Sequence, residues 1–374
     1  MGKFVGLFTV IFLLFLVPQP TLAQDQILAV QDEKMEARVE NILEEKIIEA
    51  GGSNQFYQKL ELVVTNGNLK DKIIEIENGN SPVVNNPKFN VGDEVMVSRS
   101  RDIEGNDLFY IADFVRRGPL LWLLAIFSAL VVLIGRWKGL ASLIGMGISF
   151  AVIFFFILPQ ILAGQDPILI SILGSLAIIP ATFYLSHGIN RKTTVAILGT
   201  LSALIITGIL ANIFVEAAKL TGFAQEEASF LQIAKQGTIN IKGLLLAGII
   251  IGVLGILDDI TVSQASVVEQ LRKANKELKG MDLYLRVMSV GRDHIASMVN
   301  TLVLVYTGAA MPLLLLFVNN PYPFSEVINY EIIAEEIIRT LVGSIGLILA
   351  VPITSYIAVV VMREKKLEGL GKNQ

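Results

Sequence analysis

Long apolar runs dominate the chain from Pro119 onward, and they leave it few possible folds. Each run suits a helix that crosses the roughly 30 Å hydrocarbon core of a bilayer, which takes about 17–25 residues. Hydrophobic residues make up 53% of the 374 residues and charged residues only 17%, too apolar for a soluble core to absorb. The sequence therefore predicts an all-α polytopic membrane bundle. We expect seven transmembrane helices, near residues 119–135, 139–162, 167–187, 193–214, 241–262, 294–318 and 336–362.

The basic residues of the connections predict the orientation of these spans. Lys and Arg gather in alternate connections, at 136–138, 191–192, 272–292 and 363–366, whereas 163–166 and 319–335 contain none. Cytoplasmic loops are enriched in Lys and Arg. We therefore expect a multi-pass protein of the cell membrane, with its C-terminus in the cytoplasm and the segment before the first span outside it.

The N-terminus is typical of an exported protein. Lys3 precedes apolar residues 4–17, and a small-residue cleavage site follows at 21–23, which predicts a signal peptide over residues 1–23. The alternative is an uncleaved anchor, although an apolar helix of that length reaches only about 21 Å. Both interpretations place the next segment outside the cytoplasm.

Residues 24–117 are polar and predict a small extracytoplasmic α+β domain. Val39, Ile42, Leu43, Ile47 and Ile48 have helical spacing, which predicts an amphipathic helix over Asp32–Ala50. Alternating patterns separated by turn residues then predict strands at 60–65, 72–77, 91–97 and 108–115, forming a small barrel or sandwich. Such a domain would dock a protein partner, gate the membrane part or act as a solubilising cap. The membrane domain is expected over residues 118–365 and a cytoplasmic tail over 366–374.

Composition and motifs argue against an enzyme. The chain has no cysteine and only two histidines, so thiolate chemistry is excluded and a zinc site would need mostly carboxylate ligands. No zinc-protease or phosphate-loop motif is found in the sequence. The net charge of −4 gives no reason to expect a nucleic-acid partner. We expect no cofactor, and the lipid bilayer is the one partner that the composition requires.

Asp258 and Asp259 stand side by side near the end of an otherwise apolar run. A carboxylate at membrane depth costs about 2.5–3.5 kcal/mol even on insertion scales, and two neighbours also repel each other. Asp293 and His294 follow at the start of the next run, where Ser297, Asn300 and Thr301 continue a polar stripe. Smaller stripes occur in other spans, including Thr200, Thr207, Thr354 and Ser355.

Two interpretations of this cluster stay open. In the first, Asp258, Asp259, Asp293, His294 and Asn300 form an ion- or proton-coupling site, since paired carboxylates in low dielectric share a proton and hard oxygens also suit a cation. In the second, the aspartates lie at the cytoplasmic interface and pair with Arg292.

Gly252 and Gly255 share a helical face with Asp259, at i, i+3 and i+7. Small residues at such spacing let a neighbouring helix approach closely. These glycines are therefore predicted helix-packing positions beside the carboxylates.

The two acidic motifs resemble those of a known family. Residues 252–275 (GVLGILDDITVSQASVVEQLRKAN) and 291–317 (GRDHIASMVNTLVLVYTGAAMPLLLLF) are similar to the YibE/F family of bacterial multi-pass membrane proteins. The resemblance covers roughly residues 119–365. It implies the membrane architecture and little biochemistry, because that family is largely uncharacterised.

A weaker resemblance is to the permease module of the SecD/SecF type, which couples proton flow to protein export. It implies that Asp258 and Asp259 take part in proton use. The chain departs from that module in two ways. Leu254 stands where the Gly-x-x-x-Asp-Asp motif has its glycine, and the spans at 119–135 and 139–162 are additional.

The sequence thus predicts an ion- or proton-coupled permease of unknown substrate. The alternative is a non-transporting scaffold or envelope-assembly protein that recruits an extracytoplasmic protein partner through residues 24–117.

Overall fold

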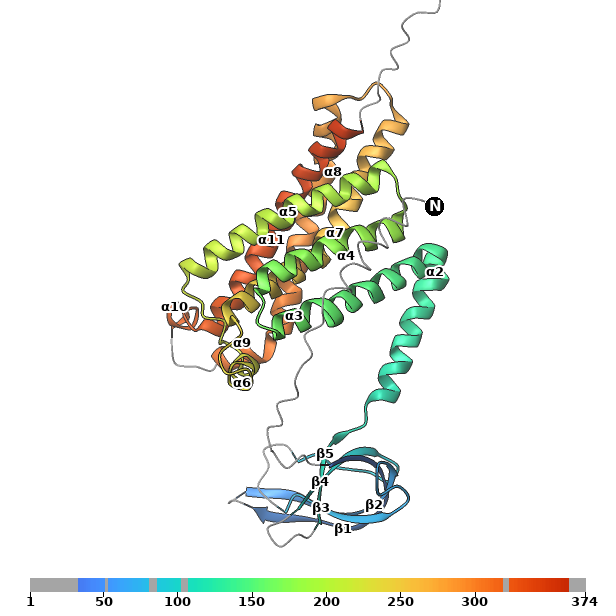
Figure 1. The fold of residues 1–374 in the computed structure, drawn as a ribbon, viewed down its shortest axis with the longest axis vertical. Helices are drawn as coiled ribbons and strands as arrows, with labels where there is room; N and C mark the ends of the chain where they lie inside the picture. The colour runs from blue at the N-terminus through green and yellow to red at the C-terminus, as the bar shows by residue number, and fades with distance from the viewer. Residues whose placement is uncertain (1–32, 51–52, 81–85, 102–106, 319–322, 363–374) are drawn as a thin grey trace, which may run out of the picture. The chain divides into compact units, whose positions relative to one another are not determined.

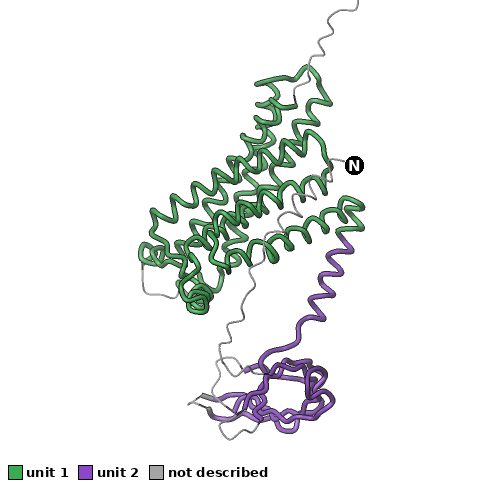
Figure 2. The backbone as a smooth tube through the Cα atoms, in the orientation of Figure 1, with its two compact units in different colours: residues 1–22, 131–374 green, residues 23–130 purple. Residues whose placement is uncertain are grey.

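The computed structural model describes residues 33–50, 53–80, 86–101, 107–318 and 323–362. The chain divides into two compact units that adjoin between Leu130 and Val131 (Figure 2). We call them the β unit and the helical unit. The predicted signal peptide and the predicted cytoplasmic tail both lie outside the described residues.

The β unit is a five-stranded antiparallel sheet (Figure 1). Its strands follow the order β3-β2-β1-β4-β5, and β3 also contacts β5, so the sheet curls toward a barrel. The positions of the four predicted strands are confirmed, because each predicted range overlaps one of the strands β2 to β5. The strands are β1 (Glu33–Ala50), β2 (Ser53–Asn66), β3 (Ile73–Asn78), β4 (Glu94–Arg101) and β5 (Asp107–Phe114).

The predicted amphipathic helix over Asp32–Ala50 is wrong, because Glu33–Ala50 is strand β1. The first part of β1 pairs with β4 on one side and β2 on the other, and there Met35, Ala37 and Val39 are buried with a period of two. Beyond Val39, β1 pairs with β2 alone, and only from Lys46 onward do the two strands form a two-stranded ribbon, because Gln58 is the first β2 residue that also pairs with β3. Leu43, beside a register shift of β1, and Ile47, in the ribbon, are both exposed. The register shifts and the missing third strand leave the apolar residues of this half without a period of two. The described part of this domain is therefore all-β, not α+β.

One buried side chain fixes the segment before β4. The Gln58 amide donates from Nε2 to the Phe89 carbonyl and accepts from the Phe89 backbone N–H, both at 2.9 Å. Phe89 itself lies in the sheet's hydrophobic core with Leu60, Leu62 and Val95. The reciprocal pair satisfies both ends of a fully buried amide, as buried polar groups require.

The helical unit is a bundle organised around α7 (Figure 1), which packs against α4, α5, α8 and α11. Its elements are the end of α2 (Arg117–Val152), η1 (Ile153–Ile157), α3 (Leu158–Leu162), α4 (Pro167–His187), α5 (Arg191–Ala217), α6 (Glu226–Ala234), α7 (Ile241–Ala274), α8 (Gly280–Ala309), α9 (Met311–Val318), α10 (Phe324–Val327) and α11 (Glu331–Val361).

Within the described residues, five helices are long and apolar enough to cross a membrane, so the predicted count of seven is not confirmed. The first of the five, Arg117–Leu162, merges the two spans expected at 119–135 and 139–162. Non-helical backbone at Arg136 (φ 50°, ψ −134°) interrupts it, and a Cβ at Gly139 would overlap the Val131 carbonyl. The expected span 294–318 is divided between α8 and α9, and it is not among the five.

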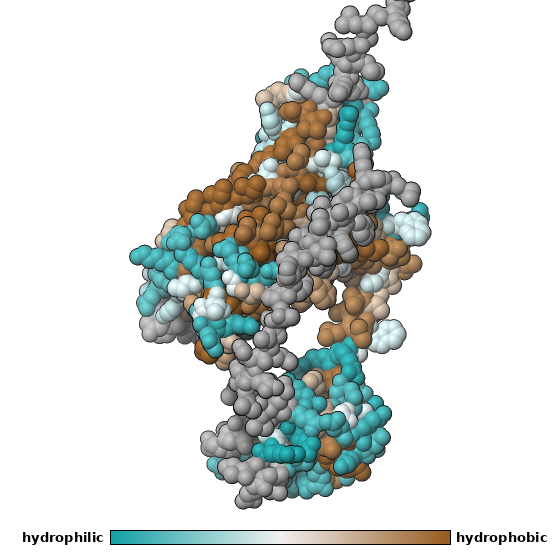
Figure 3. All heavy atoms as spheres, in the orientation of Figure 1, coloured by the Kyte–Doolittle hydropathy of each residue, from teal (hydrophilic) through white to brown (hydrophobic). Residues whose placement is uncertain are grey.

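The surface of the helical unit suits lipid. On the face shown in Figure 3, it is mostly hydrophobic, whereas the β unit is mostly hydrophilic. Large apolar side chains such as Leu133, Ile134 and Ile205 are more than half exposed. Exposed apolar area on this scale marks a membrane or protein contact.

Side-chain caps define the starts of three of these helices. Asp166, Asn190 and Asn240 accept backbone N–H groups at 2.8–2.9 Å at the N-termini of α4, α5 and α7. Such caps satisfy backbone donors that have no partner within the helix.

Candidate functional site

Asp258 and Asp259 lie on α7, the central helix, and they face different surroundings. Asp258 is half-buried and Asp259 is exposed. Neighbouring residues on a helix point about 100° apart, since there are 3.6 residues per turn. Asp258 therefore faces toward the packed side of α7, and Asp259 lies on the face of Gly252 and Gly255, which are also exposed.

That glycine face is not packed within the described chain. A Cβ built at Gly252 or Gly255 would meet no heavy atom within 4 Å. Gly291 of α8 behaves differently, because a Cβ there would lie 2.5 Å from Val351 Cγ1 and 3.3 Å from Gln264 Oε1. The close helix approach near the carboxylates is thus at Gly291. Helix packing at Gly252 and Gly255 stays a prediction, and the helix that would pack there is not among the described residues.

No ion pair reaches the aspartates in the described ranges of the chain. The ion pairs of the helical unit join Glu216, Glu269, Glu335 and Glu336 to cations, and none includes Asp258, Asp259 or Asp293. Arg292 donates from Nε to the Met288 carbonyl of its own helix at 3.3 Å. The expected pairing of an aspartate with Arg292 is therefore not formed in this structure.

Helices α7 and α8 bring the two acidic motifs to nearby levels of the bundle. They form a hairpin in which Gly291 lies against Gln264. Asp258 lies six residues before Gln264 on α7, which is about 9 Å along the helix axis. Because α8 runs back along α7 in the hairpin, Asp293, two residues after Gly291, lies about 3 Å in the same direction. Asp258 and Asp293 are therefore separated by about 6 Å along the axis. Asp293 and Asn300 are exposed and His294 is half-buried, and no hydrogen bond joins any of them to Asp258 in the described chain.

Two pairs of buried polar side chains follow Asp258 along α7, and we call them the polar column: Thr261 with Thr200, and Gln264 with Ser355. Thr261 donates from Oγ1 to the Asp258 carbonyl at 3.3 Å and lies 2.7 Å from Thr200 Oγ1 of α5. One turn further, Ser355 of α11 donates to Gln264 Oε1 at 3.0 Å. All four side chains are fully buried, so the column connects α5, α7 and α11 away from solvent.

Gln264 is the residue of this column that sequence reasoning missed. Its Nε2 has no hydrogen-bond partner among the described residues, although the side chain is 0% exposed. Its position at i+3 from Thr261 was the available signal, since two polar residues at that spacing share a helix face. Buried amides are nearly always satisfied, so this N–H group is one that a transient ligand or water would engage.

Comparison with known proteins gives the family. A model of the YibE/F-like protein family matches residues 123–364, which include both acidic motifs and the whole polar column. None of the curated proteins and none of the solved structures matches the chain. The chain is a membrane protein that belongs to the YibE/F-like family.

Proposed function

We propose that this protein is an ion- or proton-coupled permease in which Asp258 binds the coupling ion. One observation carries the proposal. Asp258 is a half-buried carboxylate without an ion-pair partner in the described chain, and its backbone carbonyl accepts the hydroxyl of Thr261, the first residue of the buried polar column. An ionisable residue within a membrane helix is costly, and it generally serves an ion or substrate pathway.

Binding of a proton or cation at Asp258 would neutralise one of two adjacent carboxylates. Two adjacent carboxylates repel each other, and one bound proton or cation removes that repulsion. Asp259 and Asp293 lie on exposed faces of α7 and α8, where they would attract cations toward Asp258. His294 and Asn300, further along α8, would complete the entry. The hydroxyls of Thr261 and Thr200 would then provide polar contacts for an ion or water inside the bundle.

The test is ion flux into proteoliposomes. The purified chain is reconstituted with a pH-sensitive dye inside the vesicles, and acidification is recorded after a proton gradient or a sodium gradient is imposed. We expect Asp258→Asn to remove most of the gradient-driven flux. Asp282→Asn is the matched control, because Asp282 is an exposed aspartate at the start of α8, away from the polar column. Equal flux for both variants and the unaltered chain would contradict the proposal.

A scaffold is the second candidate, and the β1–β2 ribbon favours it. Leu43 is 47% exposed beside a register shift of β1, and Ile47 is 71% exposed on the two-stranded ribbon that extends beyond the rest of the sheet. Exposed apolar side chains on such an extension suit a protein partner. In this reading residues 24–117 recruit an extracytoplasmic protein and the helices anchor it.

The double substitution Leu43→Ser with Ile47→Ser separates the two functions. For a scaffold, crosslinking of the chain to its partner in intact cells would be lost while ion flux is unaffected. For a permease, the double variant would keep both its flux and its cellular phenotype.

A further inference from the structure

The helical unit contains a cavity of about 380 Å³, separate from the polar column, that nothing above assigns. It lies between η1, α3, α7 and α11, and α6 and the segment before it contribute to its wall. Its volume is within the range of small-molecule sites, about 300–1,000 Å³. We propose that this cavity binds a cationic amphiphile, a molecule with an ammonium head and an alkyl body. The proposal does not depend on the permease function.

Most of the cavity wall is apolar and suits an alkyl chain. The wall includes Ile157, Ile161, Leu231, Leu245 and Ile251, which come from four different elements. Burial of each methylene against such a wall is favourable by the hydrophobic effect. The body of the ligand is therefore expected to be aliphatic.

The charged residues of the wall select a cation. Glu227, Glu335 and Arg339 line the cavity. Arg339 pairs with two carboxylates, because it donates from Nη2 to Glu335 Oε1 at 2.6 Å and its Nη1 lies 3.4 Å from Glu336 Oε2, while its buried Nε has no hydrogen-bond partner among the described residues. The wall itself holds two glutamates against one arginine, since Glu336 lies outside it, and the exposed Glu227 has no ion-pair partner in the described chain. An anionic ligand would compete with carboxylates for Arg339, whereas an ammonium group would be attracted.

A buried polar atom in the wall supports a polar head group. Ser171 of α4 is 0% exposed, and its Oγ has no hydrogen-bond partner among the described residues. A hydroxyl oxygen accepts an N–H donor. An ammonium group therefore has both a neutral acceptor at Ser171 and a carboxylate at Glu227 in the wall of the same cavity.

The cavity wall that α6 provides is held in place by α11. The Glu331 carboxylate accepts the backbone N–H of Gly222 at 2.8 Å, the backbone N–H of Thr221 at 2.5 Å and the Thr221 hydroxyl at 2.8 Å. Gly222 has φ +85°, and a Cβ there would lie 2.9 Å from the Ile241 carbonyl, so only glycine suits this turn. The segment that leads into α6 is thereby fixed, and the cavity is preformed.

The experiment compares three eight-carbon probes on the full chain in zwitterionic nanodiscs. Octylammonium, octanoate and octanol are titrated by calorimetry, with empty nanodiscs subtracted. We expect saturable binding of octylammonium and no saturable binding of octanoate. Glu227→Gln should weaken octylammonium binding by about tenfold, the usual cost of a lost charge-assisted contact. Glu226→Gln is the matched control, because Glu226 neighbours Glu227 on α6 and is not part of the wall.

Two results with the probes would overturn the proposal, and a third result with a filled cavity would do the same. One is equal binding of all three probes, which would show partition into lipid. The other is equal affinity for Glu227→Gln and Glu226→Gln. A variant that fills the cavity, Ala228→Trp, should abolish binding while leaving the thermal unfolding midpoint near that of the unaltered chain. Retained binding in a folded Ala228→Trp protein would place the probe elsewhere.

Discussion

Carboxylates of the β unit, such as Glu33, Asp107 and Asp113, form ion pairs with arginines, whereas Asp258, Asp259 and Asp293 of the helical unit form none in the described chain. The β-unit pairs lie at the surface, where water screens them and each contributes little. The unpaired aspartates occur in helices whose other residues are largely apolar. The β unit thus uses charge to fix loops and strand ends, whereas the helical unit pairs several of its glutamates and leaves Asp258, Asp259 and Asp293 unpaired among the described residues.

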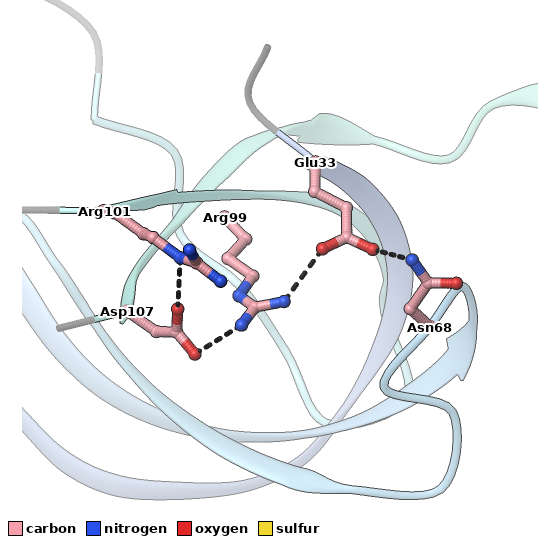
Figure 4. A network of polar contacts seen from close by, with 5 residues as sticks. All are labelled: Glu33, Asn68, Arg99, Arg101 and Asp107. Carbon is pink, nitrogen blue, oxygen red and sulfur yellow. Dashed lines mark hydrogen bonds and ion pairs between the residues drawn. The ribbon is translucent and has the colours of Figure 1, made fainter. Parts of the chain in front are cut away.

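Figure 4 shows this use of charge in the β unit. Arg99 donates from Nη1 to Glu33 at 2.9 Å and from Nη2 to Asp107 at 2.8 Å, which ties β4 to the start of β1 and the start of β5. Asn68 donates to the other oxygen of Glu33, and Arg101 Nε lies 3.7 Å from Asp107. Each carboxylate thus has two partners, in contrast to Asp258.

The largest expected effect concerns the side of the membrane on which each unit lies. The chain has no cysteine, so single cysteines can be introduced at two exposed lysines, Lys70→Cys in the β unit and Lys276→Cys between α7 and α8. A membrane-impermeant maleimide added to intact cells should label Lys70→Cys and leave Lys276→Cys unlabelled until the membrane is opened. Labelling of both, or only of Lys276→Cys, would contradict the predicted orientation.

The next effect tests how the helical unit is packed beside its unpaired aspartates. Gly291→Leu places a side chain where even a Cβ would lie 2.5 Å from Val351 Cγ1, and overpacking of this kind costs about 1–3 kcal/mol. The thermal unfolding midpoint in detergent should fall. Gly255→Leu is the matched change at an open position and should leave the midpoint unaltered. A fall for Gly255→Leu would reveal a neighbour at the Gly252 and Gly255 face, which native mass spectrometry would identify as a second copy or a partner.

A smaller effect is the acid sensitivity of the β unit. The hydrogen bond from Arg99 holds the pKa of Asp107 below its ordinary value, and the hydrogen bond from Arg116 does the same for Asp113. A carboxyl whose pKa is lowered by folding stabilises the fold above its unfolded pKa, near 3.9. That stabilisation is lost as the pH falls through the folded pKa.

Hydrogen exchange of the β4 and β5 peptides in the full chain measures this loss. The protection of these peptides against hydrogen exchange, corrected for the intrinsic exchange rate, should decline below about pH 4. Asp107→Asn should reduce protection at neutral pH and flatten the decline. If the variant kept the same profile as the unaltered chain, Asp107 would have no role in acid sensitivity.

The smallest effect is on the stability of the helical unit when Asp258 is neutralised. Asp258→Asn removes a half-buried charge that has no ion-pair partner in the described residues, so we expect a gain in unfolding free energy on the order of 1 kcal/mol or less. The gain should appear as a raised thermal midpoint, together with the loss of flux described above. A clear loss of stability would mean that Asp258 has a structural partner. The contrast between Asp258 and the paired carboxylates of the β unit would then not hold.

Much of the fold was predictable from the sequence, and the exceptions have physical causes. The strands at 60–65 and 72–77 alternate clearly because one face of each is buried, as Leu60, Leu62, Ile74 and Ile76 show. Strand β1 was misread because register shifts interrupt its distal half and because its last residues, 46–50, have no third strand to bury one face. The boundary expected between residues 135 and 139 coincides with the non-helical backbone at Arg136, although Arg117–Leu162 forms a single candidate span.

The site was predictable in part. The acidic residues stand out because charge is rare in apolar runs, and the structure describes all five of the predicted coupling residues on α7 and α8. Gln264 and its contact with Ser355 were not predicted, because they depend on which face of α11 packs against α7. Only the packed bundle places Gly291 and Ser355 beside the same amide.

Helix α11 has a consequence for how distant parts of the helical unit communicate. It carries Glu331, which holds the segment at Thr221, and Ser355, which holds Gln264, about 36 Å apart along one helix axis. A sliding or tilting of this single rod would displace the cavity wall and the polar column in the same stroke. The two ends of the bundle thus share one helix, in which Pro352 lies next to the Gln264 end.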